Sequence, residues 1–352
     1  MAKSESKGKS KLFIIGNGFD IAFKQPTRYD DLMNYIVDYT INSEDNPIYE
    51  FGPYKGSSYK GKHIIIGNIK SEFIKVNLTE KEIFCANKSF FFSELIKNRK
   101  INNNWGNIES IYYECLRNNS LRNNVKLINE ELDHLKELLL YYLNEIEKKV
   151  SINILHSVNN IEHIICSRDW RIKNLDETDM FDSIDFITFN YTSKILKAIV
   201  EMKLPITRGV QFKSEIIHIH GKLNDETNPC IVGYGDDNSE VYKNLEERLD
   251  YDCLRQFKTK QYLKSTQYHK LLGLLEKSEI HIELIGHSCE MCDKSLLKTI
   301  FTHPNVKKIK IDYHSNSDNY FKTVHNISKI IEDNISLREK LEPFPNCHEI
   351  KY

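Results

Sequence analysis

The chain contains, close to its amino terminus, the segment Leu12-Phe-Ile-Ile-Gly-Asn-Gly-Phe-Asp20. Its apolar run, Leu12 to Ile15, predicts a short buried strand, and the turn Gly16-Asn17-Gly18 follows directly. A Gly-Asn-Gly turn between a strand and a helix lets the backbone approach a phosphate, and a helix N-terminus offers free N–H donors. The full six-residue dinucleotide fingerprint is absent, so the turn indicates either a nucleotide site or a tight turn alone.

Similar short apolar segments return in the second half of the chain and alternate with helical patterns. Strands are predicted over 184–189, 215–220, 230–232, 280–285 and 307–311. Helices are predicted near 192–202, near 293–302 and over the apolar positions Phe321, Val324, Ile327 and Ile331. Short apolar strands that alternate with helices indicate an α/β fold with a Rossmann-like parallel sheet.

The region between the first strand and this series has a helical pattern. Apolar residues recur there at steps of three and four, which predicts an amphipathic helix of about six turns, on Ile128, Leu132, Leu135, Leu139, Tyr142 and Ile146. A hairpin is expected around Ile64–Ile66. The predicted organisation is a disordered tail over 1–10, a Rossmann-like core over 11–79 and 176–352, and a helical insertion over 80–175 that covers the ligand edge of the sheet.

Composition limits the classes of partner. Lys and Arg total 49 against 50 Asp and Glu, with a formal charge of -1, which argues against nucleic acid as a partner. The first ten residues are polar, and no apolar run approaches the roughly 18 residues that cross a bilayer. We therefore expect a cytoplasmic protein with free thiols and no membrane partner. The pair Cys289 and Cys292 lacks the second pair that a zinc site needs, and no metal is expected.

Four of the predicted strands end in small or polar residues. These turns are Gly16-Asn17-Gly18, Asn190-Tyr191-Thr192, His218-Ile219-His220-Gly221 and Gly286-His287-Ser288. In an open parallel sheet, ligands bind beyond the carboxyl ends of the strands. We therefore expect the four turns to converge on one pocket.

The two histidines of the third turn differ in their expected roles. Along a strand His218 and His220 point to the same face. His220, at the strand end, is the candidate for acid–base chemistry near neutral pH, and Gly221 leaves room there for a ligand. For His218 a structural role is favoured. The two histidines could also bind a metal, but no carboxylate or cysteine lies at a spacing that would complete the set of ligands.

Other polar residues have two possible roles. Asn190 could hold a water or a ribose hydroxyl, or it could cap the helix that begins near Ser193. Ser288 could cap or form a polar turn, and Asp293 could cap the helix behind it. In the predicted insertion, Trp105 is read as packed and Glu109 as solvated, although a carboxylate folded over a nucleotide site would be well placed for catalysis.

Taken together, five segments resemble the AbiH family of bacterial abortive-infection proteins, in the same order. They are Leu12–Asp20 with Gln25–Tyr29, Trp105 with Glu109, Phe189–Thr192, His218–Gly221, and Gly286–Ser288 with Asp293-Lys294. The resemblance spans roughly residues 12–313. It implies a role in phage defence.

The family in turn resembles, distantly, the sirtuin-type NAD-binding fold. The resemblance assigns Gly16 and Gly18 to the dinucleotide turn, Asn190 to the asparagine at a strand end and His220 to the catalytic base. Asn17 replaces a small alanine, and Thr192 stands where relatives carry Asp. No pair of zinc-binding CxxC motifs is present, which argues against protein deacetylation and favours hydrolysis of NAD.

This resemblance implies a site in which NAD is the substrate. His220 acts as base, and Asn190 positions water or ribose. Gly16 to Gly18 seat the pyrophosphate, and Asp20 contacts a ribose hydroxyl or caps the helix. The turn residues that complete the nucleotide site are Thr192, Gly286, His287 and Ser288.

Two other functions stay open. One is a non-catalytic sensor whose pocket binds a nucleotide signal, and the other is a metal-dependent nuclease or phosphohydrolase. The lack of a carboxylate cluster and of basic excess weakens the latter. The expected partner is a small nucleotide, with a phage-derived trigger or a second copy of the chain as further candidates.

Overall fold

The computed structural model describes residues 8–42, 63–66, 73–78, 81–86, 91, 94–95, 106–118, 125–151, 181–203, 206–207, 210–211, 214–247, 251–314 and 316–350. The chain divides into two compact units, and each unit combines segments that are distant in sequence. The first unit contains Met1–Pro26, Leu143–Ile231 and Lys258–Tyr352, and the second contains Thr27–Tyr142 and Val232–Phe257.

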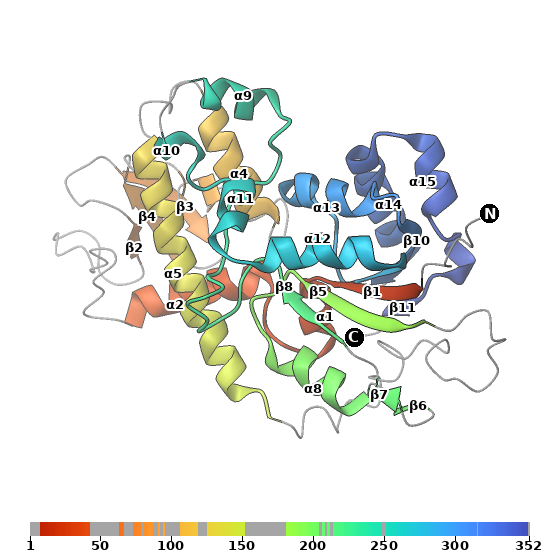
Figure 1. Cartoon of the computed structure of the whole chain (residues 1–352). Helices are drawn as coiled ribbons and strands as arrows, with labels where there is room; N and C mark the ends of the chain where they lie inside the picture. The colour runs from red at the N-terminus through yellow and green to blue at the C-terminus, as the bar shows by residue number, and fades with distance from the viewer. Residues whose placement is uncertain are drawn as a thin grey trace, which may run out of the picture. The chain divides into compact units, whose positions relative to one another are not determined.

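A six-stranded sheet forms the centre of the first unit (Figure 1). Its spatial order is β11-β10-β9-β1-β5-β8, and every neighbouring pair is parallel. Read from β8 and renumbered along the chain, this is the 3-2-1-4-5-6 order of Rossmann folds. The predicted α/β, Rossmann-like class is confirmed. The strands are β1 (Lys9–Ile15), β5 (Ser183–Thr188), β8 (Ile216–His218), β9 (Glu279–Ile285), β10 (Val306–His314) and β11 (Glu349–Ile350).

Both faces of the central strand β1 are buried, which explains its unbroken apolar run. Leu12 and Ile14 join the core on one face, whereas Phe13 and Ile15 join the core on the other. The Phe13 ring stacks on Phe186 of the neighbouring strand β5, with 5.3 Å between centroids. A strand buried on both faces needs apolar residues at consecutive positions, not at alternate ones.

Helices cover both faces of this sheet and give it three layers (Figure 1). One face packs against α12 (Gln267–Lys277), α13 (Lys294–Phe301), α14 (Ser317–Ile331) and α15 (Asn334–Lys340). The other face packs against α1 (Asn17–Ala22) and α8 (Lys194–Lys203). Each fully buried Leu, Ile or Phe of these layers contributes roughly 1.5–3 kcal/mol relative to its exposed state.

Shorter elements complete the first unit. They are β6 (Ile206–Thr207), β7 (Val210–Gln211), α11 (Lys258–Gln261), and the 3-10 helices η4 (Tyr262–Lys264), η5 (Met291–Asp293) and η6 (Phe344–Asn346). β6 and β7 pair with each other as a two-stranded antiparallel sheet. The short helices α11 and η5 carry two residues of the candidate site described below.

Three strand predictions need correction. β1 begins at Lys9 rather than Leu12, so Lys9 and Ser10 belong to the sheet and not to a tail, while residues 1–7 lie outside the described part. β8 covers only Ile216–His218. Residues 230–232 are buried but form no strand. A short apolar run reports burial, and burial alone does not distinguish a strand from a packed loop.

The second unit contains most of the long helix α5 (Val125–Lys149), which confirms the helix predicted from the apolar periodicity. A three-stranded sheet has the order β2-β4-β3, and its hairpin joins β3 to β4 rather than surrounding β2. β4 falls within the range predicted to be helical. The other elements of the unit are α2 (Tyr29–Asn42), β2 (His63–Ile66), β3 (Phe73–Leu78), β4 (Lys81–Ala86), α4 (Gly106–Arg117), α9 (Glu240–Glu246) and α10 (Tyr251–Leu254).

Buried polar contacts fix the helices of the second unit to one another. The Tyr112 hydroxyl of α4 donates to Oδ1 of Asn129 on α5 at 2.7 Å, and Nδ2 of Asn129 donates to the Asp252 carbonyl oxygen of α10 at 2.6 Å. One buried amide thus ties three helices together.

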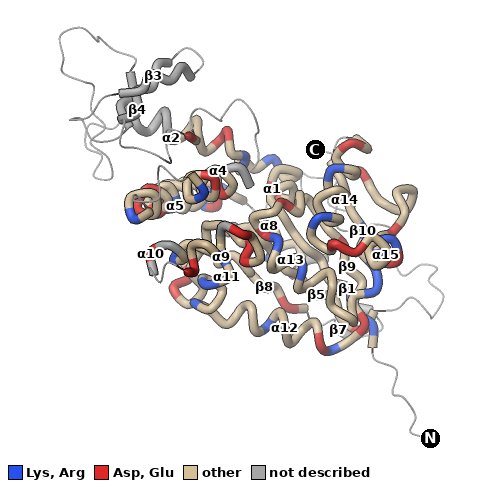
Figure 2. The backbone as a smooth tube through the Cα atoms, turned by 90° about the horizontal axis from the view of Figure 1, so that it is seen from above, with Lys and Arg blue, Asp and Glu red and all other residues tan. Residues whose placement is uncertain are grey.

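Lys and Arg residues are interspersed with Asp and Glu residues along the described elements (Figure 2). This distribution agrees with the near-equal totals of basic and acidic residues. Among the described helices, none combines the length and the apolar character that crossing a bilayer requires.

Candidate functional site

The four turns named from the sequence meet at the carboxyl edge of the central sheet. The N–H groups of Gly16 and Gly18 donate to the carbonyl oxygens of Ile285 and Gly286, each at 2.9 Å. Nδ2 of Asn190 donates to the Gly16 carbonyl oxygen at 3.1 Å. β1 and β9 are the strands between which the chain order of the sheet reverses, so this edge is where Rossmann folds bind their ligands.

The first and last of these turns pack backbone against backbone. A Cβ on Gly16 would lie 2.5 Å from the Gly286 oxygen, and one on Gly286, whose φ is +64°, would lie 2.4 Å from the Phe19 nitrogen. Glycine is therefore needed here for the contact between turns. The N–H of Phe19 donates to the Gly16 oxygen. The N–H groups of Gly16, Gly18 and Phe19 are thus all occupied, and the turn does not offer them to a phosphate as the sequence suggested.

Asp20 lies within α1, where its side chain faces the second turn instead of capping the helix. The Thr192 hydroxyl donates to Oδ2 of Asp20 at 2.5 Å. Burial raises the pKa of Asp20 to about 6, although hydrogen bonds from Thr192 and Asn190 oppose the shift. Asp20 is therefore a carboxyl group that can gain or lose a proton near neutral pH.

Asn190 does not cap the following helix. Glu147 of α5 has that role, because its Oε1 accepts from the N–H groups of Ser193 at 2.5 Å and of Lys194 at 2.9 Å. The Asn190 amide group donates to Gly16 and to Asp20 instead. This leaves Oδ1 of Asn190 as the atom with which the side chain could meet a ligand.

His220 lies in the turn after β8 and joins a buried ionic cluster. Its Nε2 is 3.1 Å from Oδ1 of Asp293, and Nζ of Lys258 is 2.7 Å from the same oxygen. The Tyr262 hydroxyl oxygen is 3.2 Å from the same Nε2. Burial opposes ionisation of Asp293, but the Lys258 ammonium and His220 outweigh it and hold the pKa of this carboxyl well below its usual range.

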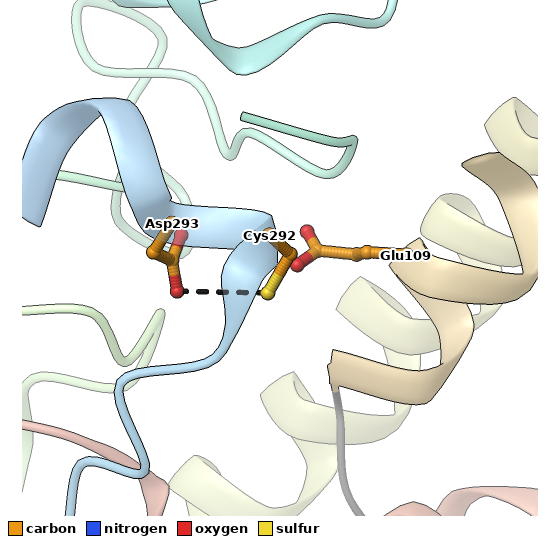
Figure 3. Close-up of side chains that lie close together, drawn as sticks. All are labelled: Glu109, Cys292 and Asp293. Atoms are coloured by element: carbon orange, nitrogen blue, oxygen red, sulfur yellow. Dashed lines mark hydrogen bonds between the residues drawn. The ribbon is translucent and has the colours of Figure 1, made fainter. Parts of the chain in front are cut away.

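Asp293 occupies the N-cap position of α13, yet its side chain makes no cap hydrogen bond. The carboxylate instead accepts from Lys258 and His220, and from the Cys292 thiol through a weak hydrogen bond of 3.8 Å (Figure 3). The position of Asp293 before a helix predicted that its side chain would cap that helix. The prediction was wrong, because tertiary contacts hold the carboxylate instead. Lys258 has only 1% of its side chain exposed, and the sequence carried no signal for it.

His287 contacts the same carboxylate from another side. Its Nε2 is 3.8 Å from Oδ2 of Asp293, and its Nδ1 accepts from the Cys289 N–H at 3.0 Å. Its ring packs edge-on against Phe189, as the ring of His220 does. Burial lowers the pKa of His287 to about 4, so it is neutral at neutral pH.

His218 has different surroundings from His220. Burial lowers its pKa to about 4, and its ring donates a hydrogen bond to the Asn190 backbone. Gly221 does not leave space for a ligand as expected: its φ is +89°, and a Cβ there would lie 2.3 Å from the Pro229 oxygen. The backbone after His220 is therefore closed by the loop that crosses it.

The remaining candidate residues differ in their burial. Asn17 is half-buried, and Ser288 is exposed, with its carbonyl oxygen accepting from Nδ2 of Asn326. Burial raises the pKa of the Cys289 thiol well above its usual range, which favours a structural role for that cysteine. Glu109 is buried in the second unit, not solvated, and accepts from the Gly233 N–H at 3.1 Å. Trp105 lies outside the described residues.

A parallel sheet in the 3-2-1-4-5-6 order, with a histidine–carboxylate pair at its carboxyl edge, defines a Rossmann-like α/β protein. The family model described as Bacteriophage abortive infection AbiH matches residues 12–315. The chain belongs to this family of abortive-infection proteins. A search of curated proteins found no match.

Proposed function

We propose that this chain is a hydrolase that cleaves NAD at the nicotinamide–ribose bond. The observation that carries the proposal is the buried contact between His220 and Asp293, at the edge of the sheet where Rossmann folds bind nucleotides. NAD is required throughout metabolism, so its hydrolysis would halt an infected cell, in agreement with membership of an abortive-infection family.

For cleavage of the nicotinamide–ribose bond, the protein needs to position the substrate and to supply a base. Cleavage passes through an oxocarbenium-like transition state, in which positive charge develops on the ribose ring. In our proposal His220 takes a proton from water or from a ribose hydroxyl, and Asn190 orients that oxygen. Asp20 accepts a hydrogen bond from the ribose and carries negative charge close to the developing cation. No metal has a part in this scheme.

The pyrophosphate needs a different arrangement from the one suggested by the sequence. The N–H groups of Gly16, Gly18 and Phe19 donate to the carbonyl oxygens of Ile285, Gly286 and Gly16. We propose that the dinucleotide contacts the outer surface of this turn and of the Gly286–Ser288 turn, where Asn17 is half-buried and Ser288 is exposed. The distant sirtuin-type resemblance supports this placement over the same strand ends.

The test is incubation of the pure full-length chain with NAD, with and without a chelator, followed by chromatography for nicotinamide. We expect nicotinamide and ADP-ribose in equal amounts in both samples, and a large loss of both in His220→Ala. Binding of NAD without release would instead identify a nucleotide sensor. Chelator-sensitive loss of phosphate or of nucleic acid would identify a metal-dependent phosphohydrolase or nuclease.

A further inference from the structure

We propose that the buried pair of Lys258 and Asp293 fixes His220 as the tautomer with hydrogen on Nε2, so that Nδ1 is the nitrogen that takes the substrate proton. This inference rests on the proposed function for its reaction, but the tautomer is a property of the folded chain and can be measured without substrate. It makes Asp293, Lys258 and Tyr262 positioning residues, since they act through His220.

Asp293 is ionised because it lies beside Lys258. Its Oδ1 is 2.7 Å from the Lys258 ammonium, and both side chains are buried. A buried cation without a counter-charge is costly, so the carboxyl beside it is ionised. An ionised carboxylate only accepts hydrogen bonds.

The ring hydrogen of His220 lies on Nε2. Nε2 is 3.1 Å from the Asp293 oxygen, and because that oxygen only accepts, Nε2 must carry the N–H. The Tyr262 oxygen, 3.2 Å from Nε2, therefore accepts from the same N–H. A neutral imidazole has one N–H, so Nδ1 keeps its lone pair. Among the described residues, none makes a hydrogen bond to Nδ1 of His220.

His287 provides an internal comparison. It contacts Asp293 as well, but its Nδ1 already accepts from the Cys289 N–H at 3.0 Å. Its lone pair is therefore occupied by the backbone, and its pKa, lowered to about 4 by burial, makes it a weak base. Of the two histidines on this carboxylate, only His220 has a nitrogen available for proton transfer.

The proposed cleavage consumes one water molecule and releases one proton. The C1′–N bond breaks and its electron pair leaves with the nicotinamide ring nitrogen. The oxygen of a water molecule forms the new bond to C1′, and the proton that this water loses goes to Nδ1 of His220. The imidazolium formed is stabilised by the Asp293 carboxylate at its Nε2 side and then releases the proton to solvent. Water and NAD give nicotinamide, ADP-ribose and one proton.

The tautomer can be read from long-range ¹H–¹⁵N spectra of the full chain labelled with ¹⁵N-histidine, at about pH 8, where ordinary histidines are neutral. His220→Gln assigns the ring signals. We expect a protonated Nε2 and a pyridine-type Nδ1 for His220. A protonated Nδ1 would overturn the proposal whatever the activity.

A double variant, Lys258→Met with Asp293→Leu, removes both charges together and leaves neither one buried alone. We expect the tautomer preference of His220 to be lost and kcat for nicotinamide release to fall on the order of 10²- to 10⁴-fold, with KM little changed. Retention of the Nε2–H tautomer and of full activity in this variant would overturn the positioning role. Nε2–H in the natural chain without nicotinamide release would support the tautomer and refute the reaction, so the two failures are distinguishable.

Discussion

Nε2 of His220 lies 3.1 Å from Oδ1 of Asp293, and the two residues come from opposite halves of the central sheet. His220 follows the edge strand β8, whereas Asp293 begins the helix that follows β9. The order 3-2-1-4-5-6 brings these strand ends to one edge, because all six strands are parallel. The contact is a product of the topology and has no local sequence signature.

Replacing the two histidines of the third turn separates catalysis from structure. We expect His220→Ala to lose about 10²- to 10⁴-fold in nicotinamide release, the usual cost of removing a general base. His218→Ala should retain most activity but melt at a lower temperature, because His218 hydrogen-bonds the Asn190 backbone. Release assays and melting curves of both variants give the comparison. Full activity in His220→Ala would end this mechanism.

Asp20 should make the chain less stable as the pH rises toward neutrality. Its folded pKa is about 6 against 3.8 for an ordinary Asp, because it is buried. Between these values the folded state holds a proton that the unfolded chain has released, so this contribution is full below about pH 4 and lost by about pH 6. Asp20→Asn should abolish the effect, on the order of a few kcal/mol, in urea unfolding at several pH values.

Thr192→Val is the matched control for Asp20. It removes the hydroxyl that donates to the carboxylate, so the pKa of Asp20 should rise further and the loss of stability should extend to higher pH. Identical pH curves for the natural chain, Asp20→Asn and Thr192→Val would contradict this account of Asp20.

His218 and His287 should act in the opposite direction. Burial lowers the pKa of each to about 4 from 6.5, so the unfolded chain binds protons that the folded chain does not. Stability should therefore fall as the pH drops from about 6.5 toward 4. His287→Asn, which keeps an acceptor near the Cys289 N–H, should reduce this dependence of the unfolding free energy on pH. His218→Gln should do the same. Proton uptake on unfolding, measured by calorimetry in two buffers, should decrease in both.

Gly16→Ala tests the contact between the first and last turns. The φ of Gly16, −114°, suits alanine, so its effect is steric: the new Cβ would lie 2.5 Å from the Gly286 oxygen. We expect a loss of about 1–3 kcal/mol or more in urea unfolding. Gly273→Ala in α12 is the control, since a Cβ there meets nothing within 4 Å, and it should stabilise by about 0.5–1 kcal/mol. Equal effects at both positions would contradict the packing argument.

Strand β1 could be predicted because it is buried on both faces and its residues Leu12–Ile15 therefore form an apolar run. In Ile280–Ile285 of β9 the apolar residues are interrupted by His281 and Glu283, and polar turns after both segments marked the edge of the site. The segment 230–232 shows the limit of that signal, since it is equally buried but lies in a loop against Gly221. The prediction of a strand over these residues was wrong, although they are buried.

The partners of His220 could not be predicted. Lysine is almost never fully buried, so the sequence did not predict that Lys258 lies buried beside Asp293. Asp293 itself precedes a helix and therefore resembled a cap. In the same way, the glycines of the first turn suggested a phosphate site, although their N–H groups are used between the turns. The partners of these side chains and N–H groups depend on contacts between segments that are distant in the sequence.

Strand β1 has consequences for synthesis on the ribosome. Leu12 pairs with Asp185 on one side and with Ile282 on the other. At roughly 5–20 residues per second, the second partner emerges on the order of tens of seconds after the first strand. Until then one of the most apolar strands of the chain lacks a neighbour, and His220 has no Asp293. A nascent or truncated chain that ends before β9 is therefore unable to assemble the site, and translation itself delays its appearance until most of the chain exists.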